Sequence, residues 1–248
     1  MERELEDYLG WLRRSGVDFT VAPGIVRDPD KDGSRVSGDA TTRHLAMPGL
    51  PGIVEHRDPT TGVASDHATH SVAWAMLRSK PARRVWDVGC GTGVLAVVAK
   101  LAGAREVLAT DVDPRALELA ARTAYAAGVE IGLLEGSLLE PLPDGAQADL
   151  VVANLPHKPV PEGMDLLVAQ NGGPSGCEVH CAFAIQAEAR LRAGARVLFF
   201  AHSLPDPQLL RCHAESFALE LVSWKRRYLL PGEFGRLQDH FLERARRG

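Results

Sequence analysis

The chain has 248 residues, of which 45% are hydrophobic and 24% charged, and its formal net charge is −4. A chain of this size can bury roughly 70–75% of its unfolded surface, so a full core forms without disulfides or a structural metal. No apolar run approaches the ~18 residues of a membrane span, the N-terminus is too acidic for a signal peptide, and the cysteines form no CxxC pair. We therefore expect a globular cytoplasmic protein with no metal and no membrane partner. The acidic balance also disfavours nucleic acid as a partner.

The first 60 residues contain few regular elements. Apolar residues with helical spacing predict a helix over residues 1–16. Residues 23–43 are polar and contain Gly and Pro, which predicts a loop or a cover. Residues 53–56 and 63–64 flank a turn-like stretch, which predicts a small hairpin.

From residue 81 onward, strand and helix patterns alternate. The candidate strands are continuously apolar, which is typical of a parallel sheet covered by helices on both faces, so the sequence predicts the α/β class. A helix capped by Ser65 or Asp66 is expected to precede the first strand and to end near Arg78. Residues 235–248 fit either a helix or an antiparallel strand. The strands are expected at residues 83–89, 105–111, 129–136, 148–154, 195–202 and 218–230, and the helices at 92–103, 114–128, 177–194 and 205–217.

A glycine-rich stretch, Asp87–Gly93, follows the first of these strands and opens a helix. Glycines at such a place let the backbone approach a ligand closely, and the helix N-terminus offers unpaired N–H groups. A tight strand–helix turn without a ligand is the alternative interpretation. The GxGxG spacing differs from the GxGxxG of nicotinamide-dependent dehydrogenases, which disfavours an oxidoreductase.

An acidic residue ends the next strand. Asp111 lies 18 positions after Gly93, where its carboxylate can accept hydrogen bonds from both ribose hydroxyls of an adenosyl group. Asp113 precedes Pro114 and is expected to cap the following helix instead. The glycine stretch and Asp111 together predict a site for an adenosyl ligand.

With these motifs, residues 60–230 resemble the class I S-adenosylmethionine-dependent methyltransferases. The resemblance implies a Rossmann-like, seven-stranded, mostly parallel sheet with helices on both faces and a reversed last strand. It also implies a bound S-adenosylmethionine, with Asp87 at its methionine end and Asp111 at its ribose. The other residues that the resemblance places at the cofactor are Gly89, Cys90, Gly91, Gly93, Val112, Ser137, Leu138 and Asn154, with His67 and Thr69 covering it.

A second motif, Asn154–His157, closes the fourth strand of the alternation. It resembles the Asn-Pro-Pro-Tyr signature of amino-methyltransferases: Asn154 and Pro156 match, Leu155 replaces the first proline, and His157 replaces the aromatic residue. The stretch Gly172–His180 is similar to the GGxDGL loop of the HemK-type glutamine methyltransferases. These resemblances imply methyl transfer to a nitrogen.

The residue types of the second motif suit that chemistry. Methyl transfer from a sulfonium is an in-line displacement, so alignment of the nitrogen lone pair supplies most of the catalysis. The side-chain carbonyl of Asn154 and the backbone carbonyl of Leu155 can accept the two N–H bonds and stabilise charge that develops on nitrogen. His157 can stack, hydrogen-bond or take a proton near neutral pH. A polar strand cap and a solvated loop histidine are the alternative interpretations.

The acceptor is less well determined by the sequence than the cofactor. We expect residues 1–60 to form an N-terminal extension or substrate lid and residues 61–248 to form the catalytic domain. Because residues 1–60 lack the helical bundle of the HemK type, and the acidic charge disfavours RNA, a small-molecule or short-peptide acceptor is favoured. Methylation of a protein glutamine, methylation of an RNA base and a non-catalytic cofactor-binding module remain as alternatives, and a homodimer is left open.

Overall fold

The computed structural model describes residues 2–27, 35–160, 167–201 and 208–224. The chain divides into two compact units, and we call Pro29–Leu155 with Ala182–Phe200 the core unit. The second unit comprises Met1–Asp28, Pro156–Cys181 and Ala201–Gly248. Among the described helices, none is long and apolar enough to cross a bilayer.

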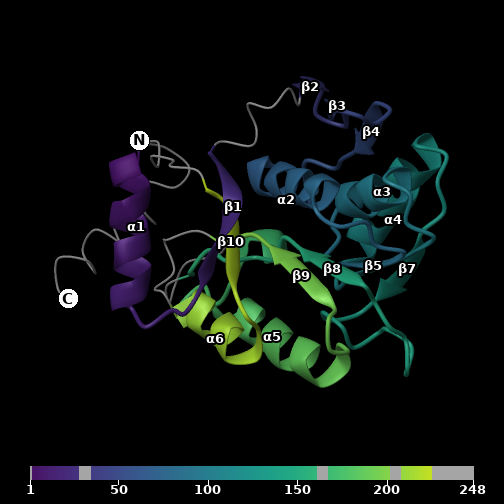
Figure 1. Cartoon of the computed structure of the whole chain (residues 1–248). Helices are drawn as coiled ribbons and strands as arrows, with labels where there is room; N and C mark the ends of the chain where they lie inside the picture. The colour runs from purple at the N-terminus through teal and green to yellow at the C-terminus, as the bar shows by residue number, and fades with distance from the viewer. Residues whose placement is uncertain (1, 28–34, 161–166, 202–207, 225–248) are drawn as a thin grey trace. The chain divides into compact units, whose positions relative to one another are not determined.

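The core unit is built on a parallel sheet of five strands in the order β7-β6-β5-β8-β9 (Figure 1). The central strands are buried along most of their length, as their continuous apolar runs predict. The α/β prediction and the mostly parallel sheet are therefore confirmed, whereas five of the seven expected strands lie in this sheet. The strands are β5 (Arg84–Val88), β6 (Glu106–Asp111), β7 (Gly132–Glu135), β8 (Leu150–Ala153) and β9 (Arg196–Phe199).

Helices cover both faces of this sheet. α2 (His67–Arg78), α3 (Val94–Leu101) and α4 (Pro114–Ala126) pack together on one face (Figure 1). For α3 and α4 this follows from right-handed crossovers, because they connect β5 to β6 and β6 to β7 and so move in one direction across the sheet. α5 (Glu178–Arg190) connects β8 to β9 on the other face, where its buried apolar side chains are Phe183, Ala184 and Ala187.

Two helix starts follow from local sequence chemistry. Asp66 caps α2, because its carboxylate accepts the Thr69 N–H at 3.0 Å while the Thr69 side chain faces the Asp66 N–H. Asp113 caps α4 by accepting the N–H of Arg115 at 3.0 Å, and Pro114 occupies the first helical position. Both caps match the sequence prediction.

A second sheet of the core unit differs from the sequence prediction. β2 (Arg35–Gly38), β3 (Thr42–Ala46) and β4 (Ile53–His56) form an antiparallel sheet in that order. The expected pairing of residues 53–56 with 63–64 is wrong, because β4 pairs with β3 and residues 63–64 are not in a strand. The expected loop over residues 23–43 is also wrong where β1 (Thr20–Arg27) and β2 form, and residues 28–34 lie outside the described residues.

The turn between β2 and β3 gives the physical reason. The Asp39 carboxylate accepts the backbone N–H groups of Thr41 and Thr42, each at 2.7 Å. These hydrogen bonds lower the pKa of Asp39 to about 2. An aspartate that binds the backbone two and three residues on closes a turn by itself, so a polar stretch can hold a hairpin without an apolar pattern.

The second unit contains α1 (Glu2–Arg14), the short helix η2 (Val168–Gln170), α6 (Gln208–Ser216) and a pair of strands. The predicted first helix forms and buries Leu9 and Leu12. The strand expected at 218–230 also forms, as β10 (Glu220–Trp224), but it pairs in parallel with β1. The pairing is irregular between Val21 and Val26, a stretch that contains a Pro-Gly pair. The prediction for residues 235–248 lies outside the described residues.

Candidate functional site

The turn after β5 has a backbone that only glycine adopts without strain. Gly89, Gly91 and Gly93 have φ values of +66°, +55° and +76°. A Cβ atom on Gly93 would lie 2.8 Å from the Cβ of Ala120 in α4. The turn is closed by the Gly93 N–H, which donates to the Cys90 carbonyl at 2.8 Å. The glycine stretch is therefore a tight turn that also brings unobstructed backbone to the edge of the sheet.

We predict that Gly93→Ala lowers the free energy of unfolding by about 3 kcal/mol, because left-handed strain and the contact with Ala120 add together. Gly145→Ala is the matched control, since Gly145 has φ +74° and, its chain neighbours aside, no atom of the described residues lies within 4 Å of the place that a Cβ would take. The control should lose only about 1 kcal/mol. Chemical denaturation of both variants measures the difference, and equal losses would contradict the packing argument.

Asp111 lies at the carboxyl end of β6, beside the glycine turn. Its Oδ2 atom accepts the Gly91 N–H at 2.9 Å, and its Oδ1 atom accepts the Asp113 N–H at 3.0 Å. Burial raises the pKa of this carboxyl group, while both N–H groups oppose that shift. Each carboxylate oxygen has a second lone pair, so both atoms can also accept from the two hydroxyls of a ribose.

Asp87 is the acidic residue of β5, and its side chain is fully buried. Its Oδ2 atom accepts the Ala96 N–H at 2.9 Å, and its Oδ1 atom has no hydrogen-bond partner among the described residues. Burial raises the pKa of Asp87 to about 7, and the negative charge of Asp111 contributes to that rise. A buried carboxylate oxygen without a partner is costly, and a cationic ligand group would offset that cost.

The loop after β7 lies against the end of β6. The Thr110 hydroxyl donates to the Leu138 carbonyl at 2.7 Å, and Leu138 adopts a left-handed φ of +52°. Val112, the residue after Asp111, is 50% exposed, and Ser137 is partly buried. Hydrogen bonds thus bring the predicted adenine residues to the strand edge that carries Asp111. Their contact with a cofactor stays a prediction.

Asn154 follows β8 and is bound to the start of α2. Its side-chain N–H₂ group donates to the Thr69 hydroxyl at 3.0 Å and to the Asp66 carboxylate at 3.3 Å. This arrangement leaves the side-chain carbonyl as the end of the amide that can accept a hydrogen bond. The Leu155 side chain lies beside Gly89, because a Cβ on that glycine would be 2.9 Å from Leu155 Cδ2. The first half of the second motif therefore lies at the same sheet edge as the glycine turn.

The two residues predicted to cover the cofactor have different surroundings. Thr69 is 8% exposed and belongs to the α2 cap described above. The His67 ring contacts the Phe200 ring edge-on, with 5.5 Å between centroids. The sequence reasoning identified Thr69 but missed that Asp66, expected only as a helix cap, also binds Asn154.

Pro156 and His157 belong to the second unit, where a glycine loop packs on His157 and the residues after it. A Cβ on Gly172 would lie 2.7 Å from the Cα of His157, and the Gly172 N–H donates to the Lys158 carbonyl at 2.9 Å. The stretch from Gly172 therefore has a structural reason for its glycines: it lets two backbone segments approach closely.

Three histidines of the second unit lie close together. The ring centroids of His157 and His180 are 6.0 Å apart, and His180 Nδ1 lies 3.0 Å from His213 Nε2. His180 and His213 are fully buried, and burial lowers the pKa of His213 to about 4. The sequence reasoning missed this cluster because the three residues are separated along the chain.

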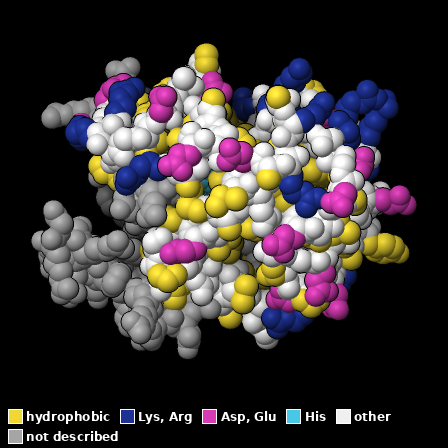
Figure 2. Space-filling view, turned by 90° about the horizontal axis from the view of Figure 1, so that it is seen from below, with side chains coloured by type: hydrophobic (Ala, Val, Ile, Leu, Met, Phe, Trp, Pro, Cys, Tyr) yellow, Lys and Arg dark blue, Asp and Glu magenta, His cyan; other side chains and the backbone are white. Residues whose placement is uncertain are grey.

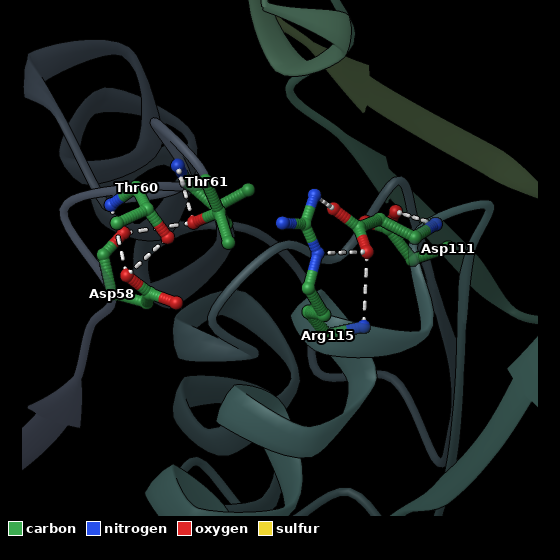
Figure 3. A network of polar contacts seen from close by, with 7 residues as sticks. Asp58, Thr60, Thr61, Asp111 and Arg115 are labelled. Atoms are coloured by element: carbon green, nitrogen blue, oxygen red, sulfur yellow. Dashed lines mark hydrogen bonds and ion pairs between the residues drawn. The ribbon is translucent and has the colours of Figure 1, made fainter.

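Figure 3 shows a polar network in two groups, one in the loop after β4 and one at the start of α4. The Asp58 carboxylate accepts from both the N–H and the hydroxyl of Thr60, and these bonds, with a smaller effect of Arg115, lower its pKa. Arg115 in turn forms an ion pair with Asp113 at 3.0 Å. This network was not predicted, and it places charged groups next to the edge that carries Asp111. Further acidic and basic side chains are scattered among apolar ones over the face shown in Figure 2.

The arrangement fits the cofactor that the sequence predicts. The glycine turn, Asp111 and Asn154 occupy the carboxyl ends of the adjacent strands β5, β6 and β8, which is where open α/β sheets bind ligands. The partnerless oxygen of Asp87 and the spare lone pairs of Asp111 are acceptors that an amino group and a ribose could use. Among the described residues, no group of three or more His, Cys, Asp or Glu could hold a metal ion.

Comparison with known proteins shows a similarity to one family. Residues 61–170 match the family model described as ribosomal protein L11 methyltransferase (PrmA). The ribosomal protein L11 methyltransferase of Pelotomaculum thermopropionicum is 41% identical over 110 residues, which are 42% of this chain and 34% of that protein. The one of Burkholderia cenocepacia is 35% identical over 184 residues, which are 70% of this chain and 54% of that protein. This chain thus spans between a third and about half of the length of these curated relatives.

Two solved structures resemble this chain. A 16S rRNA N2 G1207 methyltransferase (RsmC) from T. thermophilus, in complex with AdoMet and guanosine, has a TM-score of 0.55 and 21% sequence identity, and covers 74% of this chain and 46% of that chain. A ribosomal protein L11 methylase from Lactobacillus delbrueckii subsp. bulgaricus has a TM-score of 0.48 and 28% identity, and covers 61% of this chain and 69% of that chain.

These findings correct two sequence-based expectations. The expected small-molecule or short-peptide acceptor is wrong, because the curated relatives are methyltransferases of a ribosomal protein. The likeness to the HemK type is replaced by a likeness to the L11 methyltransferases. The chain has the Rossmann-like fold of the class I S-adenosylmethionine-dependent methyltransferases, and its residues 61–170 are similar to those that act on ribosomal protein L11.

Proposed function

We propose that this chain is an S-adenosylmethionine-dependent N-methyltransferase whose acceptor is a nitrogen of a protein, with ribosomal protein L11 as the expected substrate. The observation that carries the proposal is the shared strand edge: the glycine turn, Asp111 and Asn154 follow adjacent strands of one sheet. The matched family model and the relatives that are 35–41% identical supply the substrate class.

In this proposal the chain's own groups hold the cofactor, which supplies a methyl group on a sulfonium. Asp87 accepts from the amino group at the methionine end, and Asp111 accepts from the ribose hydroxyls. Gly89 and Gly91 bring their backbone close to the cofactor. A Cβ on Gly89 would meet Leu155, and a Cβ on Gly91 would meet Val63. Val112, Ser137 and Leu138 adjoin the adenine.

The acceptor nitrogen is oriented by Asn154. Its N–H₂ group is held by Thr69 and Asp66, so its carbonyl is fixed in direction and can accept an N–H of the acceptor. The Leu155 carbonyl is the second acceptor. Both contacts turn the nitrogen lone pair toward the methyl group and stabilise positive charge on nitrogen.

An amino group is the protein nitrogen best suited to this reaction, because its lone pair is localised once the ammonium form loses a proton. His157 is a candidate base for that proton. A lysine side chain or an N-terminal amine is therefore the expected acceptor.

The test is methyl transfer with radiolabelled S-adenosylmethionine to purified ribosomal protein L11, followed by mass-spectrometric mapping of the modified nitrogen. We expect labelled L11 and a mass increase in steps of one methyl group on an amino nitrogen. Ribosomal RNA and an unrelated lysine-rich protein serve as alternative acceptors in the same assay.

The other outcomes contradict the proposal in different ways. Cofactor binding without transfer to any acceptor would indicate a binding module. Label on a glutamine amide would indicate HemK-like chemistry, and label on RNA alone would indicate an RNA methyltransferase. Absence of cofactor binding would overturn the enzyme assignment itself.

A further inference from the structure

A carboxylate outside the described motifs is completely buried in the core unit. Glu55 lies in β4, and its side chain is 0% exposed. β4 alternates buried and partly exposed positions, so Glu55 faces the same side as the buried Ile53. The sequence signal that could have found it is an acid on the inward face of a strand, which is a costly position unless hydrogen bonds satisfy it.

Three donors from two segments satisfy this carboxylate. The Thr92 hydroxyl, inside the glycine turn, donates to Oε1 at 2.7 Å. The Ser65 N–H donates to Oε1 at 2.6 Å, and the Ser65 hydroxyl donates to Oε2 at 2.7 Å. Hydrogen bonds to a charged acceptor are shorter and stronger than neutral ones, so both segments are firmly held.

Ser65 leads directly to the acceptor side of the site. It precedes Asp66, whose carboxylate caps α2 and accepts from the side chain of Asn154. The Ser65 carbonyl is held from the same small sheet, because Arg43 in β3 donates to it at 2.6 Å. Glu55 therefore bonds to Thr92 in the glycine turn and to Ser65, the residue before Asp66. Because Asp66 binds the side chain of Asn154, we call it the Asn154 anchor.

Fold stability alone does not explain why a carboxylate occupies this buried position. Two residues of the small sheet close to Glu55, Leu45 and Ile53, belong to the apolar core. An apolar side chain of similar volume often stabilises a fold as well as a buried polar network does. A network that holds two functional segments at a fixed separation gives the carboxylate a role that an apolar residue could not take over.

We propose that Glu55 is a positioning residue that fixes the glycine turn and the Asn154 anchor relative to each other. It acts through Thr92 and Ser65 and touches neither cofactor nor acceptor. The inference rests on the proposed function, since it concerns the cofactor and acceptor sides of that same site. Through the hydrogen bond between Glu55 and Thr92, the β2–β4 sheet also supports the glycine turn of the active site.

The experiment uses the full chain and four variants. Glu55→Leu removes every acceptor, Glu55→Gln keeps the Oε1 atom, Thr92→Val removes only the bond to the glycine turn, and Thr123→Val is the matched control. Thr123 is also fully buried, and its hydroxyl also binds β4, because it accepts the His56 N–H at 3.0 Å. Thr123 belongs to α4 and not to the candidate site. Calorimetry with S-adenosylhomocysteine gives Kd, thermal unfolding gives Tm, and the L11 assay gives kcat and KM.

We expect Glu55→Leu to weaken S-adenosylhomocysteine binding and to lower kcat, each by roughly tenfold, the loss seen at metal sites when a hydrogen-bond partner of a ligating residue is removed. Glu55→Gln should restore Kd to within about threefold because its carbonyl accepts the same N–H and O–H. Thr92→Val should weaken Kd with less effect on kcat. Thr123→Val should lower Tm and leave Kd and kcat unchanged.

Two results would overturn the inference while leaving the proposed function intact. The first is an unchanged Kd in both Glu55→Leu and Thr92→Val, and the second is an equal loss of Kd in Thr123→Val. If Glu55→Leu fails to fold, the Kd of Thr92→Val compared with that of Thr123→Val still decides the question. A wild-type chain that binds S-adenosylhomocysteine but does not methylate L11 would contradict the proposed substrate, and the Kd comparison would still test Glu55.

Discussion

Replacement of Asn154 by alanine should lower kcat by about 10²- to 10³-fold, the range seen when one preorganised hydrogen-bonding group is removed from a reacting centre. The Kd for S-adenosylhomocysteine should change by less than about threefold, because the alanine backbone keeps the glycine turn and Asp111 in place. The reason is that the side-chain carbonyl of Asn154 orients the acceptor nitrogen while its N–H₂ group only holds the side chain to α2.

A second variant separates orientation from anchoring. Thr69→Val removes the shorter of the two hydrogen bonds that hold the Asn154 side chain, at 3.0 Å, but leaves the carbonyl in the site. Its kcat should fall less than that of Asn154→Ala. Single-turnover methylation of L11 and calorimetry measure the two effects. Full turnover in Asn154→Ala would show that this amide has no part in methyl transfer.

The affinity for S-adenosylmethionine should fall as the pH decreases below about 7. The pKa of Asp87 is about 7 because its side chain is buried, so the carboxyl group is largely protonated at pH 5.5 in the free chain. A positively charged amino group binds the ionised form, and below the pKa a proton must leave first. Kd should therefore rise roughly tenfold for each pH unit below 7.

Asp87→Asn tests this linkage directly. The variant cannot ionise at this position, so its Kd should be weak and nearly constant between pH 5.5 and pH 8. Asp144→Asn is the control, because the Asp144 side chain is fully exposed and its change should leave the pH profile of the wild type intact. A wild-type Kd that is constant over this range would contradict the assigned role of Asp87.

The same group predicts how stability changes with pH. The folded pKa of about 7 lies above the ordinary 3.8, so the folded chain binds more protons than the unfolded chain between these values. Its free energy of unfolding should therefore fall as the pH rises from about 4 to about 7, by about 4 kcal/mol at most from Asp87. Asp87→Asn should remove most of this slope, which denaturation at several pH values can measure.

Much of the fold follows from local sequence chemistry. Continuous apolar runs predict the five parallel strands, because a strand buried on both faces has no polar alternation. Asp66 and the Asp113-Pro114 pair predict two helix starts, since a cap is a contact between residues three positions apart or fewer. The hairpin of β2 and β3 was missed because its turn rests on the Asp39 side chain and its strands are short and polar.

Strand partners could not be predicted in the same way. β10 was expected in the main sheet, yet it pairs with β1 from the other end of the chain. An isolated apolar strand carries no information about which edge it joins, because backbone hydrogen bonds are the same for every partner. Only the tertiary structure decides between them.

The same distinction between local sequence and tertiary structure applies to the candidate site. The sequence by itself determined the glycine turn, Asp111 and the Asn154 motif, because each depends on residues that are neighbours in the chain or follow a strand at a fixed spacing. Only the tertiary structure decided that Asp66 and Thr69 hold the Asn154 amide, 85 and more positions away, and that Glu55 bonds to the glycine turn 37 positions on. The physical reason is that a hydrogen bond needs its two atoms about 3 Å apart, and for residues so distant in sequence that separation is fixed only when the sheet and helices pack.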